Sequence, residues 1–183
     1  QGSDTTMAMI AAEALGLKLE DVRIESGDTD FGVDLGAYSS RQTLMTGQAT
    51  KEAAEAVKRQ VLEVLSEALK LPMEDMDIKN SEIVFKRQPV DFSVLRTRYI
   101  REHRGWTDNP DMERLTFKEA SRIAYLARGS IVGTGKYKPP ELGGTFKGAT
   151  VGTSPAYGCS AQIAEVSVDS ETGQITVEKI TAA

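Results

Sequence analysis

Apolar residues recur every three or four positions in three stretches of the chain, which predicts three amphipathic helices. They run from about Asp4 to Leu15, from about Thr46 to Leu69 and from about Thr116 to Ala127. We expect Ser3 or Asp4 to cap the first helix and Gly16 to end it in the left-handed conformation. The second helix carries small residues near its start, which permit close approach of another backbone. The third opens with Thr116-Phe117-Lys118-Glu119, the pattern of a capping box.

Short apolar runs between the helices predict strands. The clearest pair flanks Ser170-Glu171-Thr172-Gly173, where glycine can take the left-handed position of a hairpin turn. The predicted strands are Val22 to Ser26, Asp77 to Lys79, Ile83 to Lys86, Ile131 to Tyr137, Ala161 to Asp169 and Gln174 to Thr181.

One internal repeat organises the first half of the chain. The stretch from Glu13 to Ile24 recurs from Glu67 to Ile78, with matches at Glu-Ala-Leu, the following Leu, Glu-Asp and Ile. Each copy has the pattern of a helix end, a tight corner and a strand. The predicted fold class is therefore α+β, with two helix–strand repeat units on a mixed sheet and a C-terminal β-hairpin. We expect a repeat lobe over residues 1–86, a charged excursion over 87–114, and a third helix, glycine-rich loop and hairpin over 115–183.

The charged excursion over residues 87–114 has two possible interpretations. A solvated loop or short helix explains it, and a lid that faces a partner or substrate is the alternative. In the second case Arg98, Arg101 and Arg104 would meet an anionic group such as an acyl-CoA phosphate.

Composition narrows the possible functions. The chain has 183 residues, of which 40% are hydrophobic and 27% charged, with a formal net charge of -5. This balance is typical of a globular chain and predicts no general affinity for nucleic acid or anionic membranes. The apolar run from Ala8 to Leu15 is too short to span a bilayer, so we expect no membrane segment and a cytoplasmic location. Because the chain begins with Gln1 and ends directly after a predicted strand, we expect a cut piece of a longer protein.

Few side chains are suited to catalysis or metal binding. Cys159 and His103 are the single cysteine and histidine, which excludes an internal disulfide and the usual zinc sites. The sequence offers no convincing set of nucleophile, base and orienting residue. Gly135-Lys136 is followed by Tyr137 where a phosphate-binding loop needs Ser or Thr, so we reject a nucleoside triphosphatase. We assign no catalytic and no metal-ligating residue.

Three glycine-containing polar segments remain as candidates for anion binding through backbone N–H groups. Each also has an ordinary structural reading, as a helix cap or a plain loop. They are Gln1 to Thr6, Gly36 to Arg41 and Gly143 to Tyr157.

The order of these segments resembles the molybdopterin-binding subunit of the xanthine oxidase family. The resemblance rests on Gln1-Gly2 before a threonine-bearing helix, on Gly36-Ala37-Tyr38-Ser39-Ser40-Arg41, on Thr46-Gly47-Gln48-Ala49 and on Tyr157-Gly158-Cys159-Ser160-Ala161-Gln162. It covers nearly the whole chain except the charged excursion. Within the family, Gly133 to Pro140 and Gly152 to Tyr157 look most like the alpha subunit of 4-hydroxybenzoyl-CoA reductase.

The resemblance implies a set of cofactor-binding residues. Gln1 would hydrogen-bond the cofactor beside its metal, and the neighbouring residues would follow the pterin or its nucleotide phosphate. A second loop would pass close to the metal and pterin, and a third would line the dinucleotide tail. The full set is Gln1, Gly2, Ser3, Asp4, Thr5, Tyr38, Ser39, Ser40, Arg41, Gly152, Thr153, Ser154, Pro155, Ala156 and Tyr157.

The family also implies chemistry and partners. The full enzyme would be an oxidoreductase with molybdopterin, as its cytosine dinucleotide, and would pass electrons to iron–sulfur clusters and FAD on partner subunits or regions. Its substrate would be a small molecule or an acyl-CoA. The catalytic glutamate motif of the family is not found in this sequence, so we expect the isolated chain to be inactive and to hold no cofactor. Two alternatives stay open: a non-catalytic structural α+β module, or one piece of a split subunit.

Overall fold

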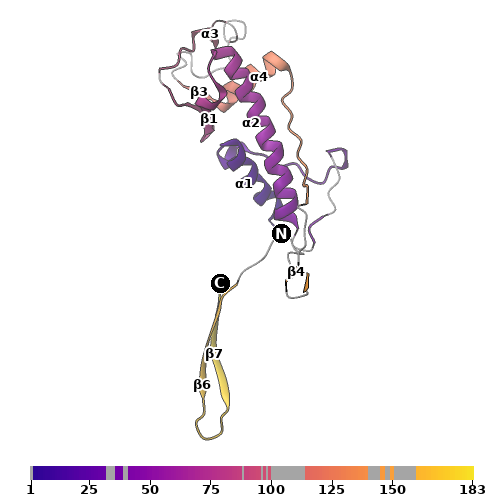
Figure 1. Ribbon diagram of the computed structural model, residues 1–183, viewed down its shortest axis with the longest axis vertical. Helices are drawn as coiled ribbons and strands as arrows, with labels where there is room; N and C mark the ends of the chain where they lie inside the picture. The colour runs from indigo at the N-terminus through magenta and orange to yellow at the C-terminus, as the bar shows by residue number, and fades with distance from the viewer. Residues whose placement is uncertain are drawn as a thin grey trace. The chain divides into compact units, whose positions relative to one another are not determined.

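The computed structural model describes residues 2–31, 36–38, 41–87, 89–95, 97, 99, 114–139, 145–146, 149–150 and 160–183. The chain divides into two compact units, Gln1–Lys138 and Pro139–Ala183, which are described separately (Figure 1). Helices and small antiparallel sheets are both present, so the α+β prediction is confirmed. No helix within the described ranges is long and apolar enough to cross a membrane.

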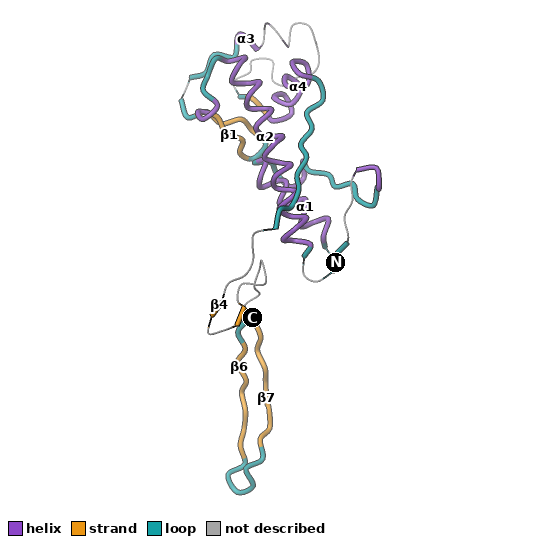
Figure 2. The backbone as a smooth tube through the Cα atoms, turned by 45° about the vertical axis from the view of Figure 1, so that its right-hand side comes forward, coloured by secondary structure: helices purple, strands orange, loops and turns teal. Residues whose placement is uncertain are grey.

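Two helices lie side by side in the first unit (Figures 1 and 2). They are α1 (Ser3–Leu15) and α2 (Gly47–Leu69), and both match their predicted ranges to within a residue. The N-cap prediction is wrong. Gly2 occupies that position with φ 78° and no side-chain cap bond, because its left-handed backbone allows Ser3 to be the first helical residue.

The repeat is visible in local structure. In the first copy α1 ends at Gly16, with φ 81°, and a 3₁₀ turn η1 (Leu19–Asp21) follows. In the second copy α2 ends at Lys70, with φ 55°, and a 3₁₀ turn η4 (Met73–Asp75) follows. Both copies therefore form a left-handed cap and a tight corner at the same offset.

Only the second copy continues into a paired strand. Residues Val22 to Ser26 form no strand, so that prediction is wrong. Arg23 and Glu25 in this stretch are exposed and pair with each other at 3.4 Å. A strand needs a neighbouring edge to satisfy its backbone groups, and among the described residues none lies beside this segment.

The sheet of the first unit has three antiparallel strands in the order β1-β2-β3, where we predicted a mixed sheet. They are β1 (Met76–Lys79), β2 (Glu82–Phe85) and β3 (Leu115–Thr116). Asn80 and Ser81, with φ 50° and 64°, form the two-residue turn between β1 and β2, and positive φ at both positions is typical of a tight hairpin.

Helix α4 (Phe117–Arg128) closes the core and confirms the third predicted helix. The Glu119 backbone N–H donates to Thr116 Oγ1 at 3.2 Å, and the Thr116 N–H donates to Glu119 Oε2 at 2.9 Å, which confirms the capping box. The core packs α2, α4 and the sheet together. Its fully buried members are Val61, Val64, Leu65, Ile78, Leu95, Leu115, Ala120, Ile123 and Ala124.

Part of the predicted excursion belongs to this core. Leu95, at the end of the short helix α3 (Ser93–Leu95), is 0% exposed and Tyr99 is 7% exposed. At these two positions the prediction of an excursion is wrong, because their large apolar groups fill space beside α2 and α4. Arg98, Arg101 and Arg104 lie outside the described residues.

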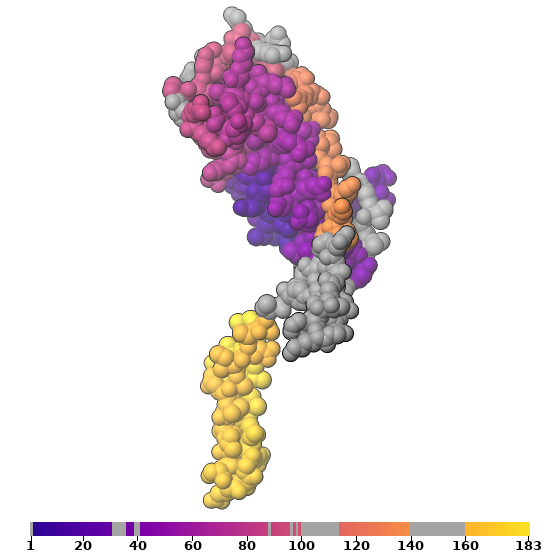
Figure 3. Space-filling view, in the orientation of Figure 1, coloured from indigo at the N-terminus to yellow at the C-terminus, as the bar shows by residue number. Residues whose placement is uncertain are grey.

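Residues Ile131 to Tyr137 run extended along α2 but form no strand, which corrects another prediction (Figure 3). Their backbone groups pair with side chains of the helix instead. Gln60 Nε2 donates to the Val132 carbonyl at 2.8 Å, and the Lys136 N–H donates to Glu52 Oε2 at 3.0 Å.

The second unit contains the predicted C-terminal hairpin, which is confirmed. Its strands are β6 (Gln162–Val168) and β7 (Ile175–Ala182), and a smaller pair consists of β4 (Thr145–Phe146) and β5 (Ala149–Thr150). Asp169 organises the turn, since its Oδ1 accepts from the N–H groups of Glu171 and Thr172. Six apolar side chains from facing positions share one side of the hairpin: Ala164, Val166, Val168, Ile175, Val177 and Ile180. All six are exposed within the unit.

Candidate functional site

Three chain segments meet at the N-terminal end of α2. The first half of α1 packs against this end of α2: Thr50 Oγ1 donates to the Met7 sulfur at 3.4 Å, and Gly47 lies against Ile10. The turn η3 (Gln42–Thr46) leads directly into α2 and also contacts α1. The extended segment that ends at Tyr137 descends along the helix to the same end (Figures 1 and 2).

The first predicted binding segment lies at the start of α1. Gly2, Asp4 and Thr5 are exposed and Ser3 is half-buried, while Gln1 lies outside the described residues. Asp4 Oδ2 accepts from Ser26 Oγ at 3.2 Å. The first backbone N–H groups of a helix have no partner within the helix, so this turn can donate to a ligand, although the Asp4 carboxylate opposes an anion close by.

The second segment is ordered by one aromatic contact. Arg41 Nη1 donates to the Tyr38 hydroxyl at 2.9 Å, and the guanidinium carbon lies 4.9 Å from the centre of the Tyr38 ring. The Tyr38 side chain is 56% exposed. The pair thus places a cationic group beside an accessible ring, and such a pair can meet an anionic or planar ligand. Ser39 and Ser40 lie outside the described residues.

Directly after Arg41 the backbone makes a π-helical turn, η3. Such turns are rare in proteins overall, but those that occur are frequently found at functional sites. Gln42 opens this turn, and its side-chain oxygen Oε1 is buried without a hydrogen-bond partner among the described residues. The sequence pattern did not mark Gln42, because burial of its amide depends on the packing of η3 against α1 and α2.

The extended segment fits closely against α2 through two glycines. A Cβ added at Gly135 would lie 1.9 Å from the Ala49 carbonyl oxygen, and one at Gly133 would lie 2.2 Å from the Ala53 carbonyl oxygen. The predicted role of small helix residues in close backbone approach is therefore confirmed. Two residues beyond Gly135, the Tyr137 hydroxyl is buried and has no hydrogen-bond partner within the described ranges.

The third predicted binding segment is not part of this description. Residues Gly152, Thr153, Ser154, Pro155, Ala156 and Tyr157 all lie outside the described residues. Their predicted contacts with the cofactor stay a prediction.

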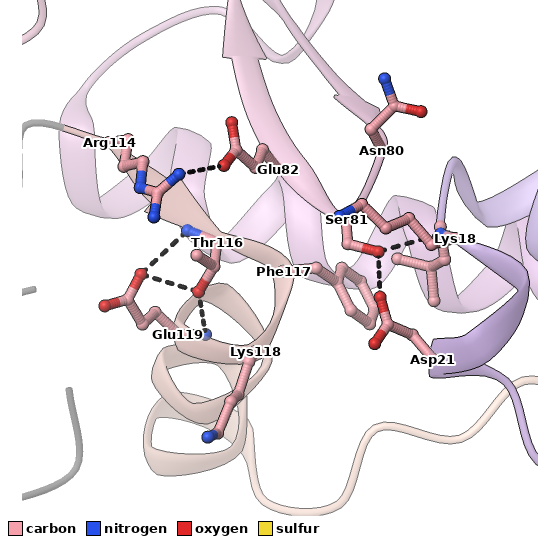
Figure 4. Close-up of a pocket in the computed structure, with 11 residues that line it drawn as sticks. Lys18, Asp21, Asn80, Ser81, Glu82, Arg114, Thr116, Phe117, Lys118 and Glu119 are labelled. Carbon is pink, nitrogen blue, oxygen red and sulfur yellow. Dashed lines mark hydrogen bonds and ion pairs between the residues drawn. The ribbon is translucent and has the colours of Figure 1, made fainter. Parts of the chain in front are cut away.

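A cavity of about 580 Å³ lies beyond the C-terminal end of α1 (Figure 4). Ser81 is its central group: Ser81 Oγ accepts from the Lys18 N–H at 2.9 Å and donates to Asp21 Oδ2. The Ser81 N–H also donates to the Gly16 carbonyl at 3.0 Å. On the far wall Arg114 pairs with Glu82 at 2.8 Å. These polar groups join the C-terminal end of α1 and η1 to the β1–β2 turn, and β2 to the residue before β3, so the cavity is a structural junction.

Comparison with known proteins identifies the family. The model of the molybdopterin cofactor-binding domain matches residues 1–183. The chain belongs to this family. The resemblance to the molybdopterin-binding subunit of the xanthine oxidase family is thereby confirmed, whereas the particular likeness to 4-hydroxybenzoyl-CoA reductase stays a prediction.

Curated relatives are much longer than this chain. It is 30% identical over 183 residues to the probable hypoxanthine oxidase XdhD of Escherichia coli K12, which covers 99% of this chain and 15% of that protein. It is 28% identical over 128 residues to the carbon monoxide dehydrogenase large chain of Afipia carboxidovorans, which covers 68% of this chain and 16% of that protein.

Solved structures share the fold at low sequence identity. The Cu,Mo-CO dehydrogenase superposes with a TM-score of 0.65 at 23% identity, over 99% of this chain and 19% of that one. Quinoline 2-oxidoreductase from Pseudomonas putida 86 superposes with a TM-score of 0.59 at 21% identity, over 99% of this chain and 20% of that one.

The residues at the N-terminal end of α2 fit a polar organic cofactor. Two buried polar atoms there, Gln42 Oε1 and the Tyr137 hydroxyl, have no protein partner among the described residues. Buried polar groups are nearly always hydrogen-bonded, so such atoms are expected where a ligand supplies the partner. The Tyr38–Arg41 pair adds a cation and an accessible ring to the same end.

Proposed function

We propose that this chain forms part of the cofactor-binding region in the large subunit of a molybdenum-dependent oxidoreductase. The observation that carries the proposal is the convergence of the start of α1, η3 and the Tyr137 segment at one end of α2. The family match over the whole chain supports it.

The proposed cofactor is molybdopterin as its cytosine dinucleotide. Gln1 and the N–H groups of Gly2, Ser3, Asp4 and Thr5 hold the pterin or the nucleotide phosphate. Tyr38, Ser39, Ser40 and Arg41 bound the space beside the pterin. The segment Gly152 to Tyr157 lines the dinucleotide tail. The described members of the first two sets lie at the start of α1 and in the segment before η3, and most of them are exposed, which supports this division.

The bound cofactor supplies the redox chemistry, and the residues of this chain position it. The Arg41 guanidinium, held by the Tyr38 hydroxyl, neutralises negative charge on the ligand. The close fit of Gly133 and Gly135 on α2 holds the segment that leads to Tyr137 against the helix. No residue of this chain is assigned as the catalytic base, so the isolated chain is expected to be inactive and free of cofactor.

Partners and substrate follow from the same proposal. The relatives include the 6-hydroxypseudooxynicotine dehydrogenase complex subunit gamma of Paenarthrobacter nicotinovorans, whose name marks it as one subunit of a complex. We expect the rest of the same subunit, together with iron–sulfur and flavin subunits or regions, to complete the enzyme in the cytoplasm. Its substrate is an aromatic, heterocyclic or aldehyde-like small molecule, or an acyl-CoA.

The test is to purify the complete subunit with its partner proteins. Molybdenum is measured by plasma mass spectrometry, the pterin by fluorescence after oxidation, and electron transfer by reduction of a dye with candidate substrates. We expect about one molybdenum and one pterin per subunit. Neither metal nor pterin in the complete protein would contradict the proposal and favour a structural module. Cofactor that is present only when a separate second chain co-purifies would indicate a split subunit.

A further inference from the structure

Two buried polar atoms in the first unit have no partner that the fold supplies. Of the three such atoms in the described residues, Asp75 Oδ2 has the Arg87 guanidinium at 3.3 Å as an ion-pair partner. The other two are Gln42 Oε1 and the Tyr137 hydroxyl, and both belong to segments that reach the N-terminal end of α2. Their coincidence at one end of one helix points to a common cause.

Packing holds the backbone in place at both residues. Gln42 opens the π-helical turn η3, which lies between α1 and the start of α2. Tyr137 follows Gly135, which leaves no room for a Cβ against the Ala49 carbonyl. Lys136 lies between Gly135 and Tyr137, and its N–H donates to Glu52 Oε2 at 3.0 Å, which holds this segment against α2. The backbone that carries each polar group is therefore held against the start of α2.

A buried polar group without a partner destabilises a protein, so a bound molecule that supplies the missing partner gains affinity from it. An amide oxygen accepts hydrogen bonds, so Gln42 calls for an N–H or O–H donor. A phenol hydroxyl donates, so Tyr137 calls for an oxygen or ring-nitrogen acceptor. A pterin ring carries both kinds of group in one plane, whereas phosphate at neutral pH supplies mainly acceptors.

We propose that Gln42 and Tyr137 bind the pterin of the cofactor directly, Gln42 through its side-chain oxygen and Tyr137 through its hydroxyl. This inference rests on the proposed function and adds two residues to it. Both are binding residues, since no step of the reaction is assigned to them.

The test compares the complete subunit and its partners in two forms, loaded with cofactor and free of cofactor. The second form is produced in a host that cannot synthesise molybdopterin. The variants are Gln42→Met and Tyr137→Phe, which keep size and remove the polar atom. The matched controls are Gln174→Met at an exposed position beside the turn of the hairpin and Tyr125→Phe in α4, where the side chain is 59% exposed. Pterin release is followed by fluorescence, and thermal unfolding is measured for both forms.

Each binding variant is expected to release pterin on the order of tenfold faster than the wild type, as loss of one buried hydrogen bond implies. In the cofactor-free form its melting temperature should be unchanged or higher, because the buried orphan atom is gone. The controls should match the wild type in both forms.

Two results would overturn the inference. One is pterin release at the wild-type rate in both variants. The other is an equal fall in melting temperature in the loaded and cofactor-free forms, which would show that the missing partners are protein groups elsewhere in the subunit. A wild-type subunit without pterin would instead contradict the proposed function itself.

Discussion

The substitutions Gly16→Ala and Lys70→Gly are expected to change the free energy of unfolding in opposite directions. The two residues hold the same position in the repeat, at the end of α1 and of α2. Both have a left-handed backbone, with φ 81° at Gly16 and 55° at Lys70. They differ in side chain and in surroundings, and these differences determine the sign.

Gly16 has no room for a side chain. A Cβ there would lie 1.9 Å from the Ile78 carbonyl oxygen and 2.6 Å from its carbon, and these are backbone atoms of β1 that cannot rotate away. The overpacking costs about 1–3 kcal/mol. The left-handed conformation adds a cost of about 1–2 kcal/mol. The unfolded chain has less conformational entropy with alanine than with glycine, which offsets about 0.5–1 kcal/mol of this loss of stability. Gly16→Ala should therefore destabilise the chain by about 2–4 kcal/mol.

Lys70 has the strained left-handed backbone, but no neighbouring atoms crowd its side chain. Its side chain is exposed, and the local strain is about 1–2 kcal/mol for a residue other than glycine. Lys70→Gly removes this strain and adds about 0.5–1 kcal/mol of backbone entropy to the unfolded state. The net result should be stabilisation of about 0.5–1 kcal/mol.

Urea unfolding followed by circular dichroism measures both changes through the shift in midpoint. Gly27→Ala is the matched control, because Gly27 has φ 80° and no atom within 4 Å of an added Cβ. It should lose no more than about 1–2 kcal/mol from strain alone. The explanation from crowding at Gly16 and backbone strain at Lys70 is wrong if Gly16→Ala lowers the free energy of unfolding no more than Gly27→Ala does, or if Lys70→Gly destabilises the chain.

Three further predictions concern the cap, one ion pair and the hairpin. Thr116→Ala should destabilise the chain by about 1 kcal/mol in the same urea assay, since it removes the capping box of α4. Burial raises the pKa of the Asp77 carboxyl, but the Lys58 ammonium at 2.6 Å and the Ile78 N–H outweigh it and hold the pKa below its usual value. Asp77→Asn should thus lower stability at neutral pH, and the difference should disappear in urea titrations as the pH falls through the folded pKa. Val177→Lys, on the exposed apolar side of the hairpin, should lower the melting temperature of the complete subunit and leave unfolding of Gln1–Lys138 within this chain unchanged.

Local signals in the sequence predicted the elements that depend on local structure. The helix periodicities, the Thr116–Glu119 capping box, Gly16 and the turn at Gly173 act within a few residues, so the sequence specifies them directly. The predicted strands Val22 to Ser26 and Ile131 to Tyr137 failed for a different reason. A strand exists only beside another strand, and apolar content cannot reveal whether an edge is available.

The spacing of Gly133 and Gly135 did contain a signal for the second case. Two glycines two residues apart weaken a strand, because they remove side chains from one face. They permit instead the close approach to Ala49 and Ala53. The polar atoms of Gln42 and Tyr137 gave no sequence signal, because a missing hydrogen-bond partner is a property of the packed structure.

One helix serves both the core and the candidate site. Helix α2 has 23 residues and is therefore about 35 Å long. Val61, Val64 and Leu65 in its C-terminal half are buried in the core, whereas Ala49 and Ala53 in its N-terminal half lie against the extended segment. Stability and cofactor binding are thus separated along the same element. Leu65→Ala should lower stability by about 2–5 kcal/mol with cofactor contacts intact in the folded fraction, while Ala49→Leu should displace the Tyr137 segment and weaken cofactor retention with the core intact.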